Sequence, residues 1–321
     1  MADLRGVEAA KPSSLERLID EYLASCRARG LSPKTIRGNY GYALKSVFLP
    51  WATEAGVTEP GQITNRVLDR FTSHLLEHGG KRGPLSRFSV ASFVESVNWW
   101  LHWLHAEGEV PAKTAAQVPR RPQRVLDVLS REEIQQLEDA ARSERDKLMV
   151  RLLGDTGMRV GELAALRTTD LMERDRSHYV RLAGQSQGGG AKGDRSRLVP
   201  IPRLWRRLQR YAERGRPKDA ASDRLFLSAR RDRRTADYEP LTNSGIQQMV
   251  RNLAEIAGVR KRVYPHLLRH SYATWALNHG MNPIMLAQVL GHSSLVMIQR
   301  NYAHSTPADA HELMAKLLAA D

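Results

Sequence analysis

Four polar residues between positions 265 and 302 could act together on a phosphate group. They are His266, Arg269, His292 and Tyr302, and they lie in or beside predicted helical runs. An arginine offers a planar fork of N–H donors to phosphate oxygens. A phenol beside such cations is a candidate nucleophile, because nearby positive charge favours its anion. A tyrosine on an amphipathic helix is more often a core residue, so this stretch by itself does not decide between a nucleophilic tyrosine and a core tyrosine.

The elements that would present these side chains are two successive helices. Pro265 suits the first turn of a helix, where a missing N–H costs nothing. His266 and Arg269 are then three residues apart and share a helix face. Gly280 and Pro283 end this helix and begin the next one.

A second stretch, LLGDTGMRVGELAAL at residues 152–166, also carries charged side chains at helical spacing. Gly157 can supply a bend before Arg159, after which an apolar helical pattern resumes. Glu162 follows three residues later, on the same predicted helix face. We expect Glu162 to pair with a guanidinium or to orient a neighbouring polar group.

A third candidate is Lys192, in the glycine-rich segment QSQGGGAKGDRSR between strand-like stretches at 178–182 and 198–201. The segment is not a phosphate-binding P-loop, because no Ser or Thr follows the Gly-Lys pattern in the required context. A lysine can release its proton when its surroundings lower its pKa, whereas an arginine effectively cannot. Lys192 is therefore a candidate general acid for a departing oxygen, the alternative being a solvated hairpin charge.

The blocks TGMRVGEL, HLLRH and LGHSS, followed by a tyrosine, occur in this order. Together they resemble the tyrosine site-specific recombinases, the phage integrase family, and AKGDRSRLVPI is similar to the neighbourhood of that family's hairpin lysine. The resemblance implies a DNA recombinase that cuts and rejoins strands through a 3′-phosphotyrosyl link, with neither ATP nor a metal. It implies six catalytic residues, with Glu162 and His270 in support: Arg159, Lys192, His266, Arg269, His292 and Tyr302.

The resemblance also implies a role for each residue. Tyr302 would attack the scissile phosphate while the two arginines and His292 hold its non-bridging oxygens. His266 would manage the tyrosine proton, and Lys192 would protonate the leaving 5′-oxygen. The ten residues from His292 to Tyr302 are one more than is usual in the family, which implies a local bulge or a different helix register.

Composition is consistent with a nucleic-acid partner. The net charge of +14 and the isoelectric point near 10.2 favour a polyanion, although they do not separate DNA from RNA or an anionic membrane. The single Cys26 excludes an intramolecular disulfide. No apolar run is long enough for a signal core or a membrane span, so we expect a cytoplasmic protein without membrane contact.

The length of 321 residues suits about two domains. We expect a mainly α-helical chain with a small β-sheet or hairpin. The predicted divisions are a flexible tail (1–12), a four-helix domain (13–108), a basic proline-containing linker (109–128) and a second domain (129–321). The resemblance implies that the four-helix domain is a SAM-like core-type DNA-binding domain and that the second is an α+β catalytic domain. Within the first domain, a helix over 64–77 is expected to bury Leu75 and Leu76. A C-terminal helix after Tyr302 would, by resemblance, dock into a neighbouring subunit.

Basic side chains at helix ends, in loops and in the linker are candidate DNA contacts, the alternative for each being an exposed, solvated charge. They are Lys34, Arg37, Lys81, Arg82, Arg87, Arg120, Arg121, Arg124, Arg195, Arg206, Arg207 and Arg210.

The implied partners are double-stranded DNA with a specific recombination site and other copies of the chain in a tetrameric synapse, with accessory DNA-bending proteins as a further possibility. The sequence leaves phage integration, mobile-element movement and Xer-type resolution open. A metallohydrolase is disfavoured, because Leu267 stands where a zincin carries glutamate between His266 and His270. Two further alternatives are a catalytically silent DNA-binding protein with a recombinase fold and a type IB-like topoisomerase.

Overall fold

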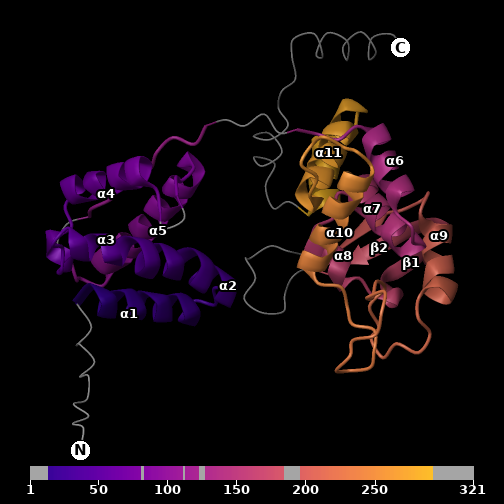
Figure 1. The fold of residues 1–321 in the computed structure, drawn as a ribbon, viewed down its shortest axis with the longest axis horizontal. Helices are drawn as coiled ribbons and strands as arrows, with labels where there is room; N and C mark the ends of the chain where they lie inside the picture. The colour runs from indigo at the N-terminus through magenta and orange to yellow at the C-terminus, as the bar shows by residue number, and fades with distance from the viewer. Residues whose placement is uncertain (1–13, 81–82, 111–112, 123–126, 184–195, 292–321) are drawn as a thin grey trace, which may run out of the picture. The chain divides into compact units, whose positions relative to one another are not determined.

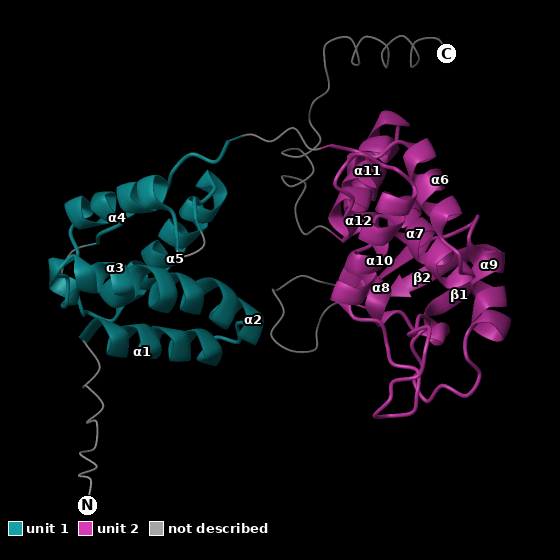
Figure 2. Cartoon of the chain, viewed as in Figure 1, with its two compact units in different colours: residues 1–124, 187–191 teal, residues 125–186, 192–321 magenta. Residues whose placement is uncertain are grey.

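The computed structural model describes residues 14–80, 83–110, 113–122, 127–183 and 196–291. These residues form two compact units, unit 1 up to residue 122 and unit 2 from residue 127 (Figure 2). The described residues are mostly helical and contain one three-stranded sheet, so the predicted fold class is confirmed (Figure 1). The functions assigned to the two domains stay predictions.

Unit 1 is built from helices that begin at hydrogen-bonding side chains. Ser32, Thr64 and Ser86 each accept a bond from a backbone N–H in the first turn, which satisfies donors that a helix start leaves unpaired. The elements are α1 (Ser14–Ala28), α2 (Pro33–Thr35), η1 (Ile36–Phe48), α3 (Leu49–Glu54), η2 (Pro60–Gln62), α4 (Asn65–His78) and α5 (Arg87–Ala106).

The apolar stripes of these helices meet in one core, which includes Phe48, Phe71 and Trp100. Their rings pack edge to face around Phe48, at centroid distances of 5.1 and 5.6 Å. The expectation for α4 was half right, because Leu75 is buried but Leu76 is 46% exposed. Adjacent helical positions point about 100° apart, and in α4 the side of Leu75 faces the core while that of Leu76 faces away from it.

The stretch after α5 packs back onto that helix. The Asn98 side chain accepts from the Ala116 backbone N–H at 2.8 Å and donates to its carbonyl at 2.9 Å. Arg121 pairs with Glu95 of α5 at 2.6 Å. The described part of the predicted linker thus has no regular secondary structure, but specific contacts hold it to unit 1.

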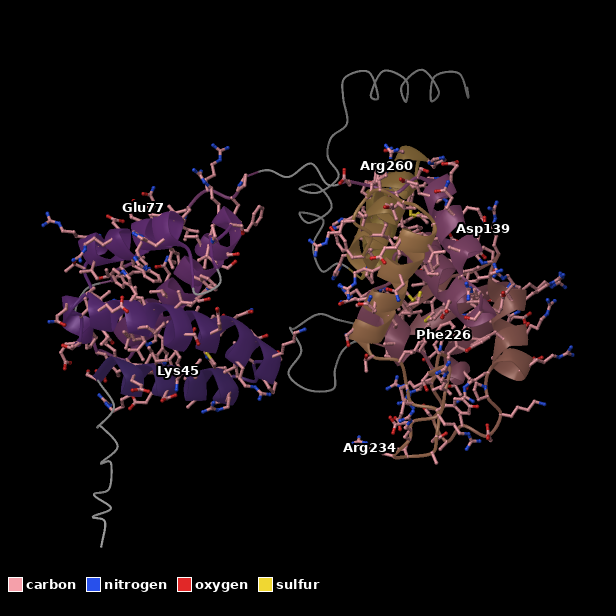
Figure 3. The ribbon with its side chains drawn as sticks, viewed as in Figure 1. Lys45, Glu77, Asp139, Phe226, Arg234 and Arg260 are labelled. Atoms are coloured by element: carbon pink, nitrogen blue, oxygen red, sulfur yellow. The ribbon has the colours of Figure 1, made fainter. Side chains whose placement is uncertain are left out.

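Unit 2 surrounds a second core of residues from its helices and sheet. Ser130 caps α6 and Glu133 returns the bond, as the SREE sequence predicts. The helical elements are α6 (Arg131–Ala140), α7 (Glu144–Thr156), α8 (Val160–Ala165), η3 (Thr168–Asp170), α9 (Trp205–Arg210), η4 (Tyr211–Gly215), α10 (Asn243–Ile256), α11 (Pro265–Asn278) and α12 (Pro283–Leu290). Figure 3 shows Phe226 in this unit and Arg234 on the exposed loop before α10.

The sheet consists of β1 (Leu171–Arg174), β2 (Ser177–Leu182) and β3 (Arg197–Pro200), all antiparallel in that order. Val180 pairs with Leu171 on one side and with Val199 on the other. The sequence predicts the second and third strands but not β1, whose four residues LMER lack a clear alternating pattern. A tight turn with left-handed Asp175 and Arg176 joins β1 to β2.

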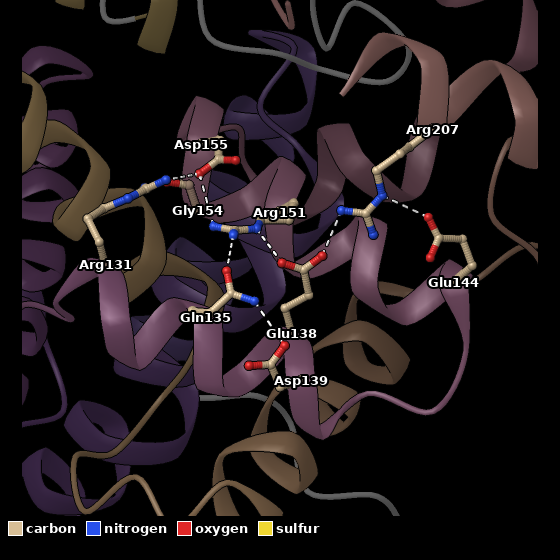
Figure 4. A network of polar contacts seen from close by, with 9 residues as sticks. All are labelled: Arg131, Gln135, Glu138, Asp139, Glu144, Arg151, Gly154, Asp155 and Arg207. Atoms are coloured by element: carbon tan, nitrogen blue, oxygen red, sulfur yellow. Dashed lines mark hydrogen bonds and ion pairs between the residues drawn. The ribbon is translucent and has the colours of Figure 1, made fainter. Parts of the chain in front are cut away.

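A chain of ion pairs ties α6, α7 and α9 together on one side of unit 2 (Figure 4). Arg151 of α7 contacts Asp155 and Glu138, and Glu138 also accepts from Arg207 of α9 at 2.7 Å. Arg207 additionally pairs with Glu144 at 2.8 Å. Its guanidinium is therefore engaged in holding α9 to α6 and α7.

Candidate active site

Arg159 stands just before α8 rather than within it. Gly157 ends α7 in the left-handed conformation (φ 62°), and Arg159 is extended at the N-cap of α8. Its backbone N–H donates to Oε2 of Glu162 at 2.7 Å, and its Nη1 donates to Oε1 at 3.0 Å. The predicted pairing is present, but it arises from a helix start and not from two residues on one helix face, which corrects that expectation.

Glu162 is a buried carboxylate between two guanidiniums, with its side chain 2% exposed. Nη1 and Nη2 of Arg197 donate to its two oxygens at 2.8 and 2.9 Å. Burial acts to raise the pKa of Glu162, but hydrogen bonding and charge from Arg197, and then from Arg159, outweigh it and hold the pKa below the ordinary range. Glu162 is therefore anionic at neutral pH.

Arg197 is a site residue that the sequence analysis did not select. It is the first residue of β3, and its Nε also donates to the Val289 carbonyl at 2.7 Å. Its side chain is 10% exposed. Alternation along the strand was the available signal, because Arg197 shares a strand face with buried Val199 and an arginine at such a position requires partners.

Arg269 lies inside α11 and is buried, with 6% of its surface exposed. Its Nη1 donates to the Gly157 carbonyl at 2.7 Å, and its Nη2 donates to the Leu290 carbonyl at 2.8 Å. It therefore joins the turn that precedes Arg159 to the end of α12.

Three arginines meet at the C-terminal end of α12. Arg197 bonds the Val289 carbonyl and Arg269 bonds the Leu290 carbonyl, while Nη2 of Arg159 bonds the Gly291 carbonyl at 3.0 Å. The last carbonyls of a helix lack intrahelical partners and carry partial negative charge, so they attract guanidiniums. The two arginines of the predicted catalytic set are thus brought together.

His266 and His270 lie one turn apart on α11. Partial burial, followed by the charges of Arg269 and Arg159, lowers the pKa of His266. Burial, followed by the charges of His266 and Arg269, lowers the pKa of His270. Burial and the neighbouring positive charges therefore favour a neutral imidazole at neutral pH, which is the form that accepts a proton.

The other predicted residues divide into three groups. Lys192, His292 and Tyr302 lie outside the described residues, as do Lys81, Arg82, Arg124 and Arg195. Arg121 and Arg207 are engaged with carboxylates of their own units. The remaining candidate DNA contacts are exposed, and they are Lys34, Arg37, Arg87, Arg120, Arg206 and Arg210.

Among the described residues, no group of three or more His, Cys, Asp or Glu side chains is arranged to hold a metal ion. No helix in the same part of the chain is long and apolar enough to cross a membrane.

Comparisons with known proteins give the family. The family model described as "Phage integrase family" matches residues 127–309. Tyrosine recombinase XerC 2 of Ralstonia nicotianae is 29% identical over 304 residues, covering 91% of this chain and 82% of the relative. Tyrosine recombinase XerD of Staphylococcus aureus (strain Mu50 / ATCC 700699) is 28% identical over 312 residues, covering 93% and 97%.

Solved structures support the fold. The XerH site-specific recombinase, in a post-cleavage complex with palindromic difH substrate, has a TM-score of 0.71 at 17% identity, covering 97% of this chain and 98% of that one. The Tn1549 transposon integrase, in complex with a circular intermediate DNA, has a TM-score of 0.71 at 19% identity, covering 94% and 99%.

The chain belongs to the phage integrase family, the tyrosine site-specific recombinases. The predicted enzyme class, a site-specific DNA recombinase, is confirmed. The silent DNA-binding protein and the type IB-like topoisomerase are not favoured, because relatives along nearly the whole chain are tyrosine recombinases.

Proposed function

We propose that this recombinase cuts DNA by attack of the Tyr302 phenol on a scissile phosphate, which forms a 3′-phosphotyrosyl bond and releases a 5′-hydroxyl. Arg159, Arg269 and His292 would bind the non-bridging oxygens as negative charge grows on them. His266 would take the phenolic proton, and Lys192 would donate a proton to the leaving oxygen. The reverse attack by a 5′-hydroxyl of another strand would rejoin the DNA. Glu162 and His270 would support the catalytic side chains without contacting the phosphate.

The observation that carries this proposal is the meeting of Arg159 and Arg269 at the end of α12. They bond the carbonyls of Gly291 and Leu290, and the next residue in the chain is His292. Two guanidiniums that lie far apart in sequence thus bond carbonyls within two residues of the proposed third phosphate ligand.

Charge at this point favours a phosphate. Arg159, Arg197 and Arg269 gather there, and Glu162 is the carboxylate that pairs with the first two. Three guanidiniums and one carboxylate leave a local excess of positive charge, which a phosphodiester would offset. Lowered pKa values keep the neighbouring imidazoles neutral and able to accept a proton from a phenol.

Double-stranded DNA carrying a recombination site is the proposed substrate, because the Tn1549 integrase is named in a complex with a circular intermediate DNA and XerH in a complex with its difH substrate. The exposed Lys34, Arg37 and Arg87 of unit 1 and the described linker residue Arg120 would contact the phosphate backbone. We further propose that copies of the chain assemble on paired sites as a tetramer, with the segment after Tyr302 docking in trans. Accessory DNA-bending proteins would assist at some sites, and the protein would act in the cytoplasm.

A covalent trap tests the reaction. The protein would be incubated, without added metal or ATP, with nicked duplexes prepared from the total genomic DNA of its source, including the DNA that flanks its own gene. A nick beside the cleavage point lets a short fragment diffuse away, so the covalent intermediate accumulates. Adducts that resist denaturation would be captured and their DNA sequenced, which locates the site.

Two phenol-deleting variants separate the outcomes. Tyr302→Phe should form no adduct, while Tyr264→Phe, a matched change at an exposed tyrosine beside α11, should form it as the wild type does. An adduct that persists in Tyr302→Phe would show that another residue is the nucleophile. Failure of the wild type to form any adduct across the whole genomic library would refute the proposed reaction.

A further inference from the structure

Arg197 reaches two elements of unit 2 from the sheet. Its two terminal nitrogens contact both oxygens of Glu162 on α8, at 2.8 and 2.9 Å, and its Nε contacts the Val289 carbonyl of α12, at 2.7 Å. A planar guanidinium that makes parallel bonds to a carboxylate is fixed in orientation as well as in position. Arg197 therefore connects β3, α8 and α12 through one rigid group.

Gly291 lies directly against this guanidinium. A Cβ atom on Gly291 would lie 2.6 Å from Nη1 of Arg197 and 2.8 Å from its Cζ. Gly291 also has a positive φ of 66°, the left-handed conformation that ends α12. The backbone that leads into position 292 is thus packed directly against Arg197.

Glu162, which pairs with Arg197, also pairs with Arg159. Glu162 receives the Arg159 backbone N–H and side chain, while Arg159 reaches on to Gly291. Without Arg197, Glu162 would keep its bonds to Arg159, and the Val289 carbonyl would lose the bond from the Arg197 Nε. Neither the orientation of the carboxylate nor the end of α12 would then be fixed by the sheet.

We propose that Arg197 is a positioning residue of the recombinase reaction, which sets Arg159 and the α12 terminus in their catalytic geometry through Glu162 and Val289. This inference rests on the proposed function of the same site. Arg197 acts through its neighbours, and the geometry of its guanidinium matters as well as its charge. A lysine at this position would keep the charge but could not bond both carboxylate oxygens and the carbonyl together.

The test compares two variants on the duplex that the wild-type trap identifies. Arg197→Met keeps the length of the side chain without its charge, and Arg197→Lys keeps the charge without the fork. Single-turnover adduct formation at saturating protein gives the rate of the chemical step, and duplex binding gives Kd separately. We expect the rate to fall about 10- to 100-fold in both variants, the range for lost hydrogen bonds to a charged group, with little change in Kd.

Two matched controls lie on the same sheet. Arg181 on β2 also donates from two nitrogens to a carboxylate, here to one oxygen of Asp170 at 3.0 and 3.1 Å, and Arg181→Met should keep the wild-type rate. Val199→Ala removes buried packing from β3 itself and destabilises the strand without touching Glu162. If Val199→Ala slows the chemical step as much as Arg197→Met does, loss of stability explains the effect and the inference is wrong.

A double variant examines the route through Glu162. If Arg197 acts through this carboxylate, Glu162→Gln combined with Arg197→Met should be little slower than the slower single variant, whereas independent residues would multiply their effects. A multiplicative loss would overturn the route, and a wild-type rate in Arg197→Met or Arg197→Lys would overturn the positioning role. Both results leave the proposed function intact, because it depends on wild-type adduct formation.

Discussion

Replacing Glu162 by Gln should destabilise unit 2 in a way that depends on pH. The carboxylate is 2% exposed and accepts four hydrogen bonds from Arg159 and Arg197. Glutamine keeps one acceptor oxygen but removes the negative charge and turns an NH₂ group toward a guanidinium. Removing one partner of a buried pair costs about 3 to 5 kcal/mol, because the remaining charge stays buried.

The expected size follows from the exposure of the two partners. The Arg197 side chain is 10% exposed, so the free-energy cost of removing its counter-ion falls within the range for a buried pair. The Arg159 side chain is 30% exposed, and water screens much of its share. We therefore expect a loss of about 3 kcal/mol in the free energy of unfolding of unit 2 at pH 7.

The pH dependence has a definite sign. The pKa of Glu162 is lowered in the folded state, so its contribution to stability is full above the unfolded pKa of about 4.3 and is lost as pH falls through the folded pKa. Wild type should thus lose its advantage over Glu162→Gln below about pH 4.3. At neutral pH the difference should be constant.

Urea unfolding at a series of pH values would measure this difference. Pulsed hydrogen exchange of peptides from α7 and α10 reports unit 2 by itself, since a two-unit chain need not unfold in one step. Glu173→Gln, on β1 with its side chain 57% exposed, is the matched control and should change stability by less than about 0.5 kcal/mol. Equal stability of Glu162→Gln and wild type at pH 7, or a difference that stays constant down to pH 3, would refute this account of the site.

Three further predictions concern other parts of the chain. Gly291→Ala should slow adduct formation about 10-fold or more, because the added Cβ would lie 2.6 Å from Nη1 of Arg197. Gly280→Ala, also at positive φ but with nothing within 4 Å of its Cβ, should only lower the stability by about 1 kcal/mol. Adduct rates and thermal unfolding of both variants would test this difference. The rate of adduct formation should rise with pH through an apparent pKa below 6.5, because the lowered pKa of His266 makes it a neutral base at higher pH. In His266→Gln, the pH–rate profile should no longer show this rise. Asn98→Ala should destabilise unit 1 by about 1 to 3 kcal/mol, because it leaves the backbone N–H and carbonyl of buried Ala116 without their side-chain partner. Hydrogen exchange of α5 peptides during urea unfolding would measure the loss. An unchanged unfolding midpoint would contradict it.

Much of the local structure could be predicted because its causes are local. Caps at Ser32, Thr64, Ser86 and Ser130 depend on side chains that lie within three residues of the N–H groups they satisfy. Apolar periodicity likewise placed the long helices. Strand β1 escaped prediction because its four residues are held by pairing with β2 and have no strong pattern of their own.

The candidate site shows the same division. The order of the blocks TGMRVGEL, HLLRH and LGHSS, followed by a tyrosine, indicated a recombinase through its resemblance to the family, whereas the side-chain types alone indicated only a candidate phosphate site. The partners of the site residues were not predictable. Glu162 was expected to pair with a guanidinium, but the sequence did not indicate that a second arginine, Arg197, would share it.

The sequence by itself determined which groups are present and where helices begin, since both follow from residue types and near neighbours. Only the tertiary structure decided that the end of α12 would be the meeting point of three arginines. The bond from Arg159 to Gly291 joins residues 132 positions apart, and that from Arg197 to Val289 joins residues 92 apart. Such contacts form because burial of the surrounding core fixes where each element ends, and a buried guanidinium then requires an acceptor at that place.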